Sequence, residues 1–126
     1  QQFIYSLRRM LDPIKEHVDN NFNPLPAEYT KEFAPVRQKI NDLMRMSCEQ
    51  IETSRYENYR EILAEADACK DELSVLRKKH IDRIQHLSDN SLMQISLVYL
   101  NVLQESQEFL SVMRHQLRAA KKFMEK

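Results

Sequence analysis

Histidine and cysteine, the side chains that most often supply nucleophiles, bases and metal ligands, are few and widely spaced in this sequence. They are His17, His80, His86, His115, Cys48 and Cys69. A di-iron site in a helical bundle needs two Glu-x-x-His motifs, and no glutamate here stands three residues before a histidine. A zinc site needs clustered ligands, which single residues far apart do not supply. We therefore expect no catalytic residue, no metal site and no cofactor, and we expect that the protein is not an enzyme.

Two acidic patterns have the spacing of a helix face. Glu57, Glu61 and Glu65 recur at intervals of four residues, and such a row of carboxylates could mark a cation site. Carboxylates are also favoured near the start of a helix by its dipole, and basic residues interrupt the row, so we interpret it as a solvated face. Asp82 and His86 are likewise interpreted as a surface pair.

Basic residues gather in two places, at 77–83 and at 118–126. Both fit the ends of helices, where the dipole favours cations. The functional alternative is contact with anionic lipid headgroups or with a partner, and it applies most to the second group because that group is terminal. The sequence leaves both interpretations open.

The composition limits the fold class. The 126 residues include no glycine and only four prolines, which leaves few ways to build tight turns. A hydrophobic content of 42% is too high for disorder, and the length suits one modest core rather than two domains. Basic and acidic residues both number 19, which argues against a nucleic-acid partner. We expect a single all-α domain over residues 1–126.

The compartment is indicated by hydropathy and by the cysteines. No apolar run approaches the roughly 20 residues that cross a bilayer, so we expect the chain itself to be soluble. A turn near Thr53 and Ser54 would set Cys48 and Cys69 roughly 13 Å apart along the helix axes, too far for a disulfide. We expect both to be buried and unpaired, as in a reducing compartment. The sequence starts at Gln1 inside a helical pattern, and we interpret it as a piece of a longer protein.

Apolar residues recur every three or four positions along four stretches, the spacing of amphipathic helices. The first such stripe consists of Phe3, Leu7, Met10, Ile14 and Val18. Pro13 predicts a kink or a late start in this helix, and the run DNNFNPLP at 19–26 predicts its end. Thr30 or Ala34 is the expected cap of the second helix, with Pro35 in its first turn.

Two sequences of the form S-x-x-E/Q predict the starts of the third and fourth helices, at Ser54 to Glu57 and at Ser91 to Gln94. We expect breaks near 19–30, 52–55 and 88–91. Short connections require antiparallel neighbours, which predicts an antiparallel up-down four-helix bundle. The third and fourth helices should each span about 35 residues, and the second only about 20 to 24.

Two stretches resemble the PhoU family, in particular the PhoU-like cytosolic domain of bacterial sodium/phosphate cotransporters. They are DACKDELSVLRKKHIDRIQ at 67–85 and ISLVYLNVLQESQEFLSVMRH at 95–115. The likeness lies in a LRKKHIDRI-type run at the end of a charged helix, a short break, and a VYLNVL-type start of the next helix. It covers roughly residues 35–120. The resemblance implies a PhoU-like bundle that acts as a cytoplasmic regulatory or structural domain of a sodium-dependent phosphate transporter.

The resemblance also bears on metal binding. PhoU proteins bind metal ions through acidic E-x-x-x-D clusters on such a helix. One alignment of VYLNVL places Gln107 and Ser111 at the ligand positions, and a shift of three residues places Leu110 and Arg114 there. Neither alignment supplies two carboxylates, so the resemblance implies a domain that lacks this site.

The partner implied by the resemblance is the membrane domain of the same transporter, which would handle sodium and phosphate. A second copy of the chain is the other candidate partner. The location would be the cytoplasmic face of the inner (plasma) membrane. The alternative is a free-standing helical adaptor that binds a partner helix. Apolar spans encoded upstream of Gln1 would support the transporter, and an initiator methionine close to Gln1 would support the adaptor.

The expected helix lengths also predict an interaction surface. The third and fourth helices should extend beyond the second by about 10 residues, or about 15 Å. The apolar residues in this overhang are Ile81, Ile84, Leu87, Leu92 and Ile95. Because exposed apolar surface costs roughly 25 cal/mol per Å², we expect a cover. The candidates are the loop DNNFNPLPAEY at 19–29, a second copy of the domain, and the membrane domain.

Overall fold

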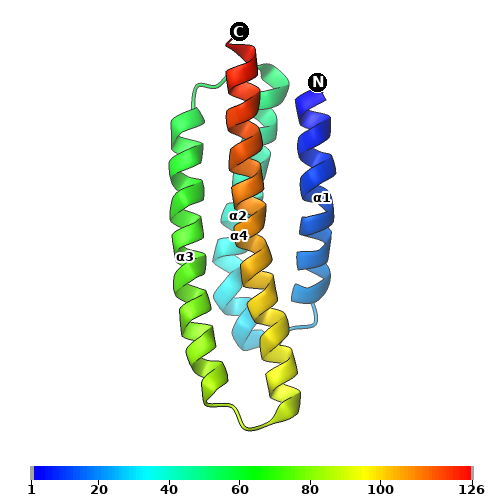
Figure 1. The fold of residues 1–126 in the computed structure, drawn as a ribbon, viewed down its shortest axis with the longest axis vertical. Coiled ribbons are helices and arrows are strands. Elements are labelled where there is room, and N and C mark those ends of the chain that lie inside the picture. Colours follow the sequence, from blue (N-terminus) through cyan, green and yellow to red (C-terminus); the bar gives the residue numbers. More distant parts are fainter. Residues whose placement is uncertain (1, 126) are drawn as a thin grey trace.

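The protein is built from four helices. The computed structural model describes residues 2–125, with side chains for Tyr5 and for residues 7–125. The helices are α1 (Gln2–Phe22), α2 (Ala27–Thr53), α3 (Tyr59–Gln85) and α4 (Asn90–Met124) (Figure 1). No strand occurs in this described range. The prediction of an all-helical chain with four helices is confirmed.

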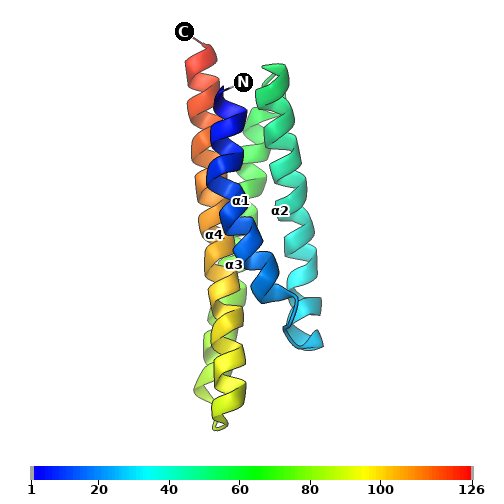
Figure 2. The same cartoon turned by 90° about the vertical axis from the view of Figure 1, so that its right-hand side faces the viewer.

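The four helices lie side by side along one long axis, and the chain reverses direction at each connection (Figures 1 and 2). Helix α4 contacts each of the other three helices, and α2 contacts α1 and α3 as well. The two chain ends lie together at one end of the molecule, which we call the terminal end. The α3–α4 connection lies at the opposite end, which we call the tip, and it extends past the α1–α2 connection.

The stripe of α1 differs from the prediction by one position. Leu7 and Leu11 are fully buried, whereas Met10 is 46% exposed. Leu11 lies four residues after Leu7, about 40° around the helix, and this places it on the core side of α1. The side chain of Phe3 lies outside the described residues. Pro13 lies within α1 and does not delay its start, because the carbonyl that loses its partner, that of Arg9, belongs to an exposed residue.

The loop between α1 and α2 is shorter than predicted. Helix α1 runs through Asn20 and Asn21 to Phe22, and α2 begins at Ala27, directly after Pro26. The expected starts at Thr30 and Ala34 are therefore wrong. Burial explains the difference, since Phe22 and Leu25 are both buried in the core and hold the connection close to it.

The connection between α2 and α3 uses a left-handed residue instead of a capping box. Ser54 has φ 55°, and the amides of Ser54 and Arg55 bond back to carbonyls in the last turn of α2. Glycine usually occupies such a position because it has no Cβ, but this chain has no glycine. Helix α3 starts only at Tyr59, so the predicted box at Ser54 and Glu57 is wrong.

Helix α4 is capped by Asp89 rather than by the predicted Ser91. The Asp89 carboxylate accepts hydrogen bonds from the amides of Ser91 (2.8 Å) and Leu92 (3.4 Å). These amides have no partner within the helix, and the negative charge is also favoured by the positive end of the helix dipole. The capping-box pattern at Ser91 and Gln94 is therefore present in the sequence, but Ser91 does not cap the helix.

The observed helix lengths make the overhang of α3 and α4 beyond α2 shorter than predicted. Helices α2 and α3 each span 27 residues and α4 spans 35, so the lengths expected for α2 and α3 are wrong. The first turn of α2 reaches Arg83 of α3 through Glu28 (3.5 Å) and Ser96 of α4 through Tyr29 (3.1 Å). The part of α4 beyond these contacts is residues 90–95, which is about 9 Å of helix. The tip extends past α2, but by less than expected.

Replacing Asp89 with alanine should lower the free energy of unfolding by about 1 kcal/mol, because two amides at the start of α4 lose their acceptor. Urea unfolding followed by circular dichroism measures this change. The matched control is Ser91→Ala, which should leave stability within about 0.5 kcal/mol of the wild type. The opposite ranking of the two variants would show that Ser91 is the cap.

Candidate functional site

The five residues of the predicted interaction surface lie at the tip, on the last turns of α3, in the connection, and on the first turns of α4. We call Ile81, Ile84, Leu87, Leu92 and Ile95 the tip surface. Ile81, Leu92 and Ile95 are exposed by 39%, 48% and 37%, and the other two are partly buried. None of the five belongs to the buried core cluster. The tip surface is thus an apolar end beyond the closed core.

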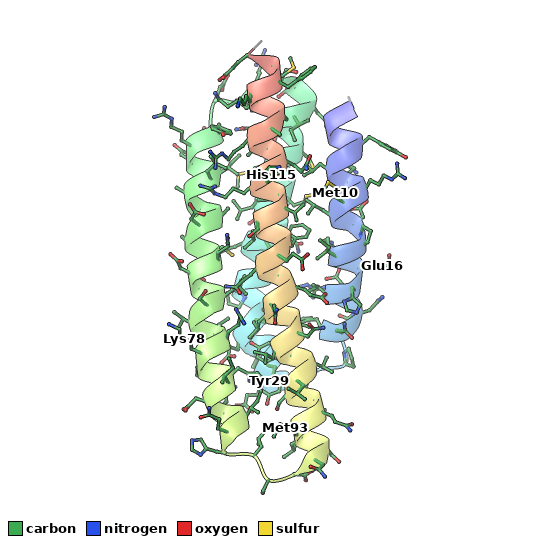
Figure 3. The ribbon with its side chains drawn as sticks, in the orientation of Figure 1. Met10, Glu16, Tyr29, Lys78, Met93 and His115 are labelled. Atoms are coloured by element: carbon green, nitrogen blue, oxygen red, sulfur yellow. The ribbon has the colours of Figure 1, made fainter. Side chains whose placement is uncertain are left out.

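The α1–α2 connection closes the core next to the tip surface and leaves three of its residues exposed. Phe22 packs against Phe33, with ring centroids 5.1 Å apart, and Tyr29 stacks on Tyr99 at 4.6 Å. Figure 3 shows Tyr29 nearer the middle of the molecule than Met93, which marks the first turn of α4 at the tip. The loop predicted as an intramolecular cover therefore packs on the layer above the tip surface.

That layer is a cluster of polar and aromatic side chains contributed by α2, α3 and α4. We call it the buried polar cluster; its members are Tyr29, Glu32, His80, Arg83, Ser96 and Tyr99. His80, Ser96 and Tyr99 are almost completely buried. The cluster separates the apolar core from the tip surface.

Glu32 is the centre of the buried polar cluster. Its carboxylate accepts hydrogen bonds from the Tyr99 hydroxyl (2.8 Å), from Nη2 of Arg83 (2.7 and 2.9 Å) and from Lys79 (3.2 Å). Burial alone raises the pKa of Glu32, but these hydrogen bonds outweigh it and hold the pKa below its usual value. Glu32 is therefore ionised at neutral pH, and it joins α2 to both α3 and α4.

His80 lies beside Glu32 and is held as a neutral ring. Its Nε2 donates a hydrogen bond to the carbonyl of Ser96 (2.7 Å), which fixes the proton on that nitrogen. The ring meets Tyr29 and Tyr99 edge to face, with centroids 5.0 and 4.7 Å away. Nδ1 is buried, and no side chain or backbone group in the described residues bonds to it. Burial lowers the pKa of His80, more than its bond to Ser96 raises it.

These groups are arranged for packing rather than for catalysis. Burial, together with the hydrogen bond to Glu32, raises the pKa of Tyr99, so its hydroxyl remains a donor. His80 and Tyr99 have no exposed surface, whereas a general base must reach a proton of its substrate. The carboxylate of Glu32 already has three donors. What the cluster does chemically is to join three helices by charge-assisted hydrogen bonds.

The positions that the resemblance aligned with metal ligands carry out structural roles. The Gln107 amide donates to the carbonyl of Lys70 (3.0 Å) and to Ser74 Oγ (2.8 Å), and its oxygen accepts from Arg77 (3.0 Å). It thereby joins α4 to α3. In the second alignment Leu110 is buried, and Arg114 pairs with a carboxylate of α3. Among residues 2–125 no group of three or more histidine, cysteine, aspartate or glutamate side chains is placed to hold a metal ion.

Glu105, on the other side of α4, makes a comparable link to α1. It accepts hydrogen bonds from His17 Nδ1 (2.6 Å) and from Asn101 (3.2 Å). A second polar link, between Arg37 and Asp19 (2.7 Å), joins α2 to α1. Each pair of neighbouring helices is thus joined by polar side chains.

Both cysteines are buried and unpaired, as predicted. Burial raises the pKa of Cys69 to about 11, and it raises the pKa of Cys48 in the same direction. Since the thiolate is the reactive form, both thiols are weak nucleophiles at neutral pH.

The buried polar cluster was missed by sequence reasoning. In the sequence His80 is only one of several widely spaced histidines, and no motif connects it with Glu32 or Tyr99. A signal was present, because Glu28 and Glu32 on one helix and Lys79 and Arg83 on another have the same spacing of four residues. Opposite charges with this spacing on antiparallel neighbours can pair in register.

The chain was compared with known proteins. No family model, no curated protein and no solved structure matches it. No helix in the described part of the chain is long and apolar enough to cross a membrane. The site must therefore be interpreted from its own geometry.

The free energy of unfolding should fall as the pH is lowered from about 7.5 to about 5.5. The unfolded chain takes up a proton at His80 near pH 6.5, whereas the folded state keeps the ring neutral, so protonation favours unfolding. The contribution approaches about 1.4 kcal/mol per pH unit below that pKa. Glu32 faces His80 as a carboxylate and Arg83 as a cation, and the lowered pKa of Glu32 makes it titrate only below this window. Urea unfolding at a series of pH values measures the slope.

In His80→Gln the slope should become shallower, because a glutamine amide can still donate to Ser96 but does not titrate. The matched control is His86→Gln, which makes the same substitution at an exposed position at the end of α3, outside the buried polar cluster. An undiminished slope in His80→Gln would show that another group causes the pH dependence.

Proposed function

We propose that this chain is a cytoplasmic regulatory or structural domain of a sodium-dependent phosphate transporter. It would be an antiparallel up-down PhoU-like bundle with no catalysis of its own. The observation that carries the proposal is the position of the stretches that resemble the PhoU family. LRKKHIDRI (76–84) supplies His80 and Arg83, and VYLNVL (98–103) supplies Tyr99.

The same short stretches therefore carry the resemblance and build the buried polar cluster. A buried network of this kind is strongly specified, because each polar group needs a partner in a defined place. A likeness concentrated in residues that lock three helices together supports a shared fold. It gives no support to a shared active site, and this fits a regulatory or structural role.

The partner in this proposal is the membrane domain of the same transporter, joined to the chain upstream of Gln1. Sodium and phosphate would be handled there, and the chain would lie at the cytoplasmic face of the inner (plasma) membrane. The full-length gene product tests this directly. Apolar spans of about 20 residues upstream of Gln1 are expected. An open reading frame that starts close to Gln1 would overturn the proposal.

The tip surface favours a second candidate function, a free-standing helical adaptor. In either case we propose that the tip surface binds a second copy of the chain. Its apolar centre is flanked by both signs of charge, with Lys78 and Asp82 on α3 and Asp89 before α4. The chain has a formal net charge of zero, so two copies do not repel each other. Such a surface is complementary to itself rather than to a strongly charged partner.

Replacing Ile81 and Leu92 together with serine should abolish self-association and leave the melting temperature nearly unchanged, because both side chains are already more than a third exposed. Sedimentation velocity at high micromolar concentration measures the association. Ile84 is less suitable because it is partly buried and contributes to stability.

The matched control replaces Met10 and Val75 with serine. These residues are 46% and 65% exposed and lie outside the tip surface, so association should persist in this variant. A wild-type chain that stays monomeric, or equal loss of association in both double variants, would show that the tip surface is not the contact between copies.

A further inference from the structure

The terminal end differs chemically from the tip. The last turns of α4 carry Arg118, Lys121 and Lys122, and α1 begins beside them with Arg8 and Arg9. Arg118 and Lys122 are exposed, and within residues 2–125 no carboxylate lies at ion-pair distance from either. Arg8 is paired with Glu52 and Lys121 with Glu125, so within residues 2–125 the cations of this group without a carboxylate at ion-pair distance are Arg9, Arg118 and Lys122.

Apolar and aromatic side chains are interspersed with these cations. Tyr5 is 66% exposed and Met124 is 51% exposed, and the guanidinium of Arg9 lies 5.9 Å from the centre of the Tyr5 ring. Lys121 lies 5.0 Å from the centre of the Tyr59 ring. Aromatic rings with an apolar body and a polar edge are enriched where proteins meet the headgroups of a bilayer.

A hollow of about 620 Å³ lies between α4 and the start of α3, and His115, Arg118 and Lys122 are among the residues that line it. Figure 3 shows His115 on α4, in the half of the molecule that includes the terminal end. Of the nearby carboxylates, Glu57 precedes α3 and Glu61 lies in its first turn, and both alternate in the sequence with the exposed cations Arg55 and Arg60. The surface on which cations outnumber carboxylates is therefore that of the last turns of α4 and the first half of α1.

We propose that the terminal end binds the surface of an anionic lipid bilayer, with Arg118 and Lys122 contacting headgroup phosphates and with Tyr5 and Met124 at the headgroup boundary. The helix dipole explains why cations occur at the end of α4. It does not explain exposed apolar side chains among them, and charge complementarity with anionic lipid accounts for both features.

This inference rests on the proposed function for the source of the bilayer, because a domain joined to a membrane protein is held close to lipid. It adds an orientation of the domain relative to the membrane. Helix α3 spans 27 residues, so the tip would stand about 40 Å from the headgroups. The tip surface would then be free to bind a second copy.

The test is flotation of the purified chain with vesicles. Vesicles of phosphatidylcholine containing roughly a third phosphatidylserine should bind the chain at low salt, and pure phosphatidylcholine vesicles should bind it much more weakly. Arg118→Glu with Lys122→Glu should weaken binding to the anionic vesicles by at least about tenfold. The matched control is Lys31→Glu with Lys70→Glu, which makes the same charge change away from the terminal end at two lysines that have no ion-pair partner among the described residues, and it should bind as the wild type does.

Three results would overturn the inference: no binding to anionic vesicles at low salt, equal loss in the two double variants, or full release by millimolar inorganic phosphate at constant ionic strength. The last result would assign the hollow to a free anion instead. The outcome is separable from that of the proposed function, because vesicle binding by a chain whose gene encodes no upstream span would keep this inference and overturn the transporter assignment.

Discussion

The arrangement of the helices depends on one partly buried carboxylate. Glu32 projects from α2 and is bonded by Arg83 and Lys79 of α3 and by Tyr99 of α4. Removing a carboxylate from water is costly, and only several well-placed donors compensate for that cost. The register of α2 against the α3–α4 hairpin is therefore fixed, because a shift by one turn would leave the charge without partners. His80 and Tyr29 pack around this contact and depend on it.

This constraint also explains where the core stops. Between the cluster and the terminal end the helices bury leucine, isoleucine, valine and phenylalanine. Between the cluster and the tip the α3–α4 hairpin continues without α2. The exposure of the apolar residues of the tip surface is thus a consequence of where α2 begins. A start at Ala27 brings Glu28, Tyr29 and Glu32 to the level of Arg83 and Ser96, whereas a later start would have left the hairpin bare over a greater length.

Periodicity was sufficient to predict the helices but not their ends. The spacing of apolar residues identified four helical stretches, and the loops at Asn23 and Ser88 follow from local turn chemistry. The ends depend on tertiary contacts that a local pattern does not contain. Ala27 begins a helix because Leu25 is buried beside it, and Ser54 takes a left-handed conformation because the chain must turn there without glycine. The residues of the tip surface could be predicted because they continue the apolar stripes of the third and fourth helices. The buried polar cluster could not be predicted, because its members come from three helices.

The central position of α4 determines how the domain can be made. Helices α1 and α3 each pack against α4, and in the described residues they do not pack against each other. During synthesis the first three helices leave the ribosome before α4, which makes the larger part of the contacts of both α1 and α3. Domains generally fold as units, and this unit is incomplete until the 35 residues of α4 emerge. A nascent chain truncated before Asn90 would expose the inner faces of α1 and α3 to chaperones, so the quality control of this domain depends on the synthesis of α4.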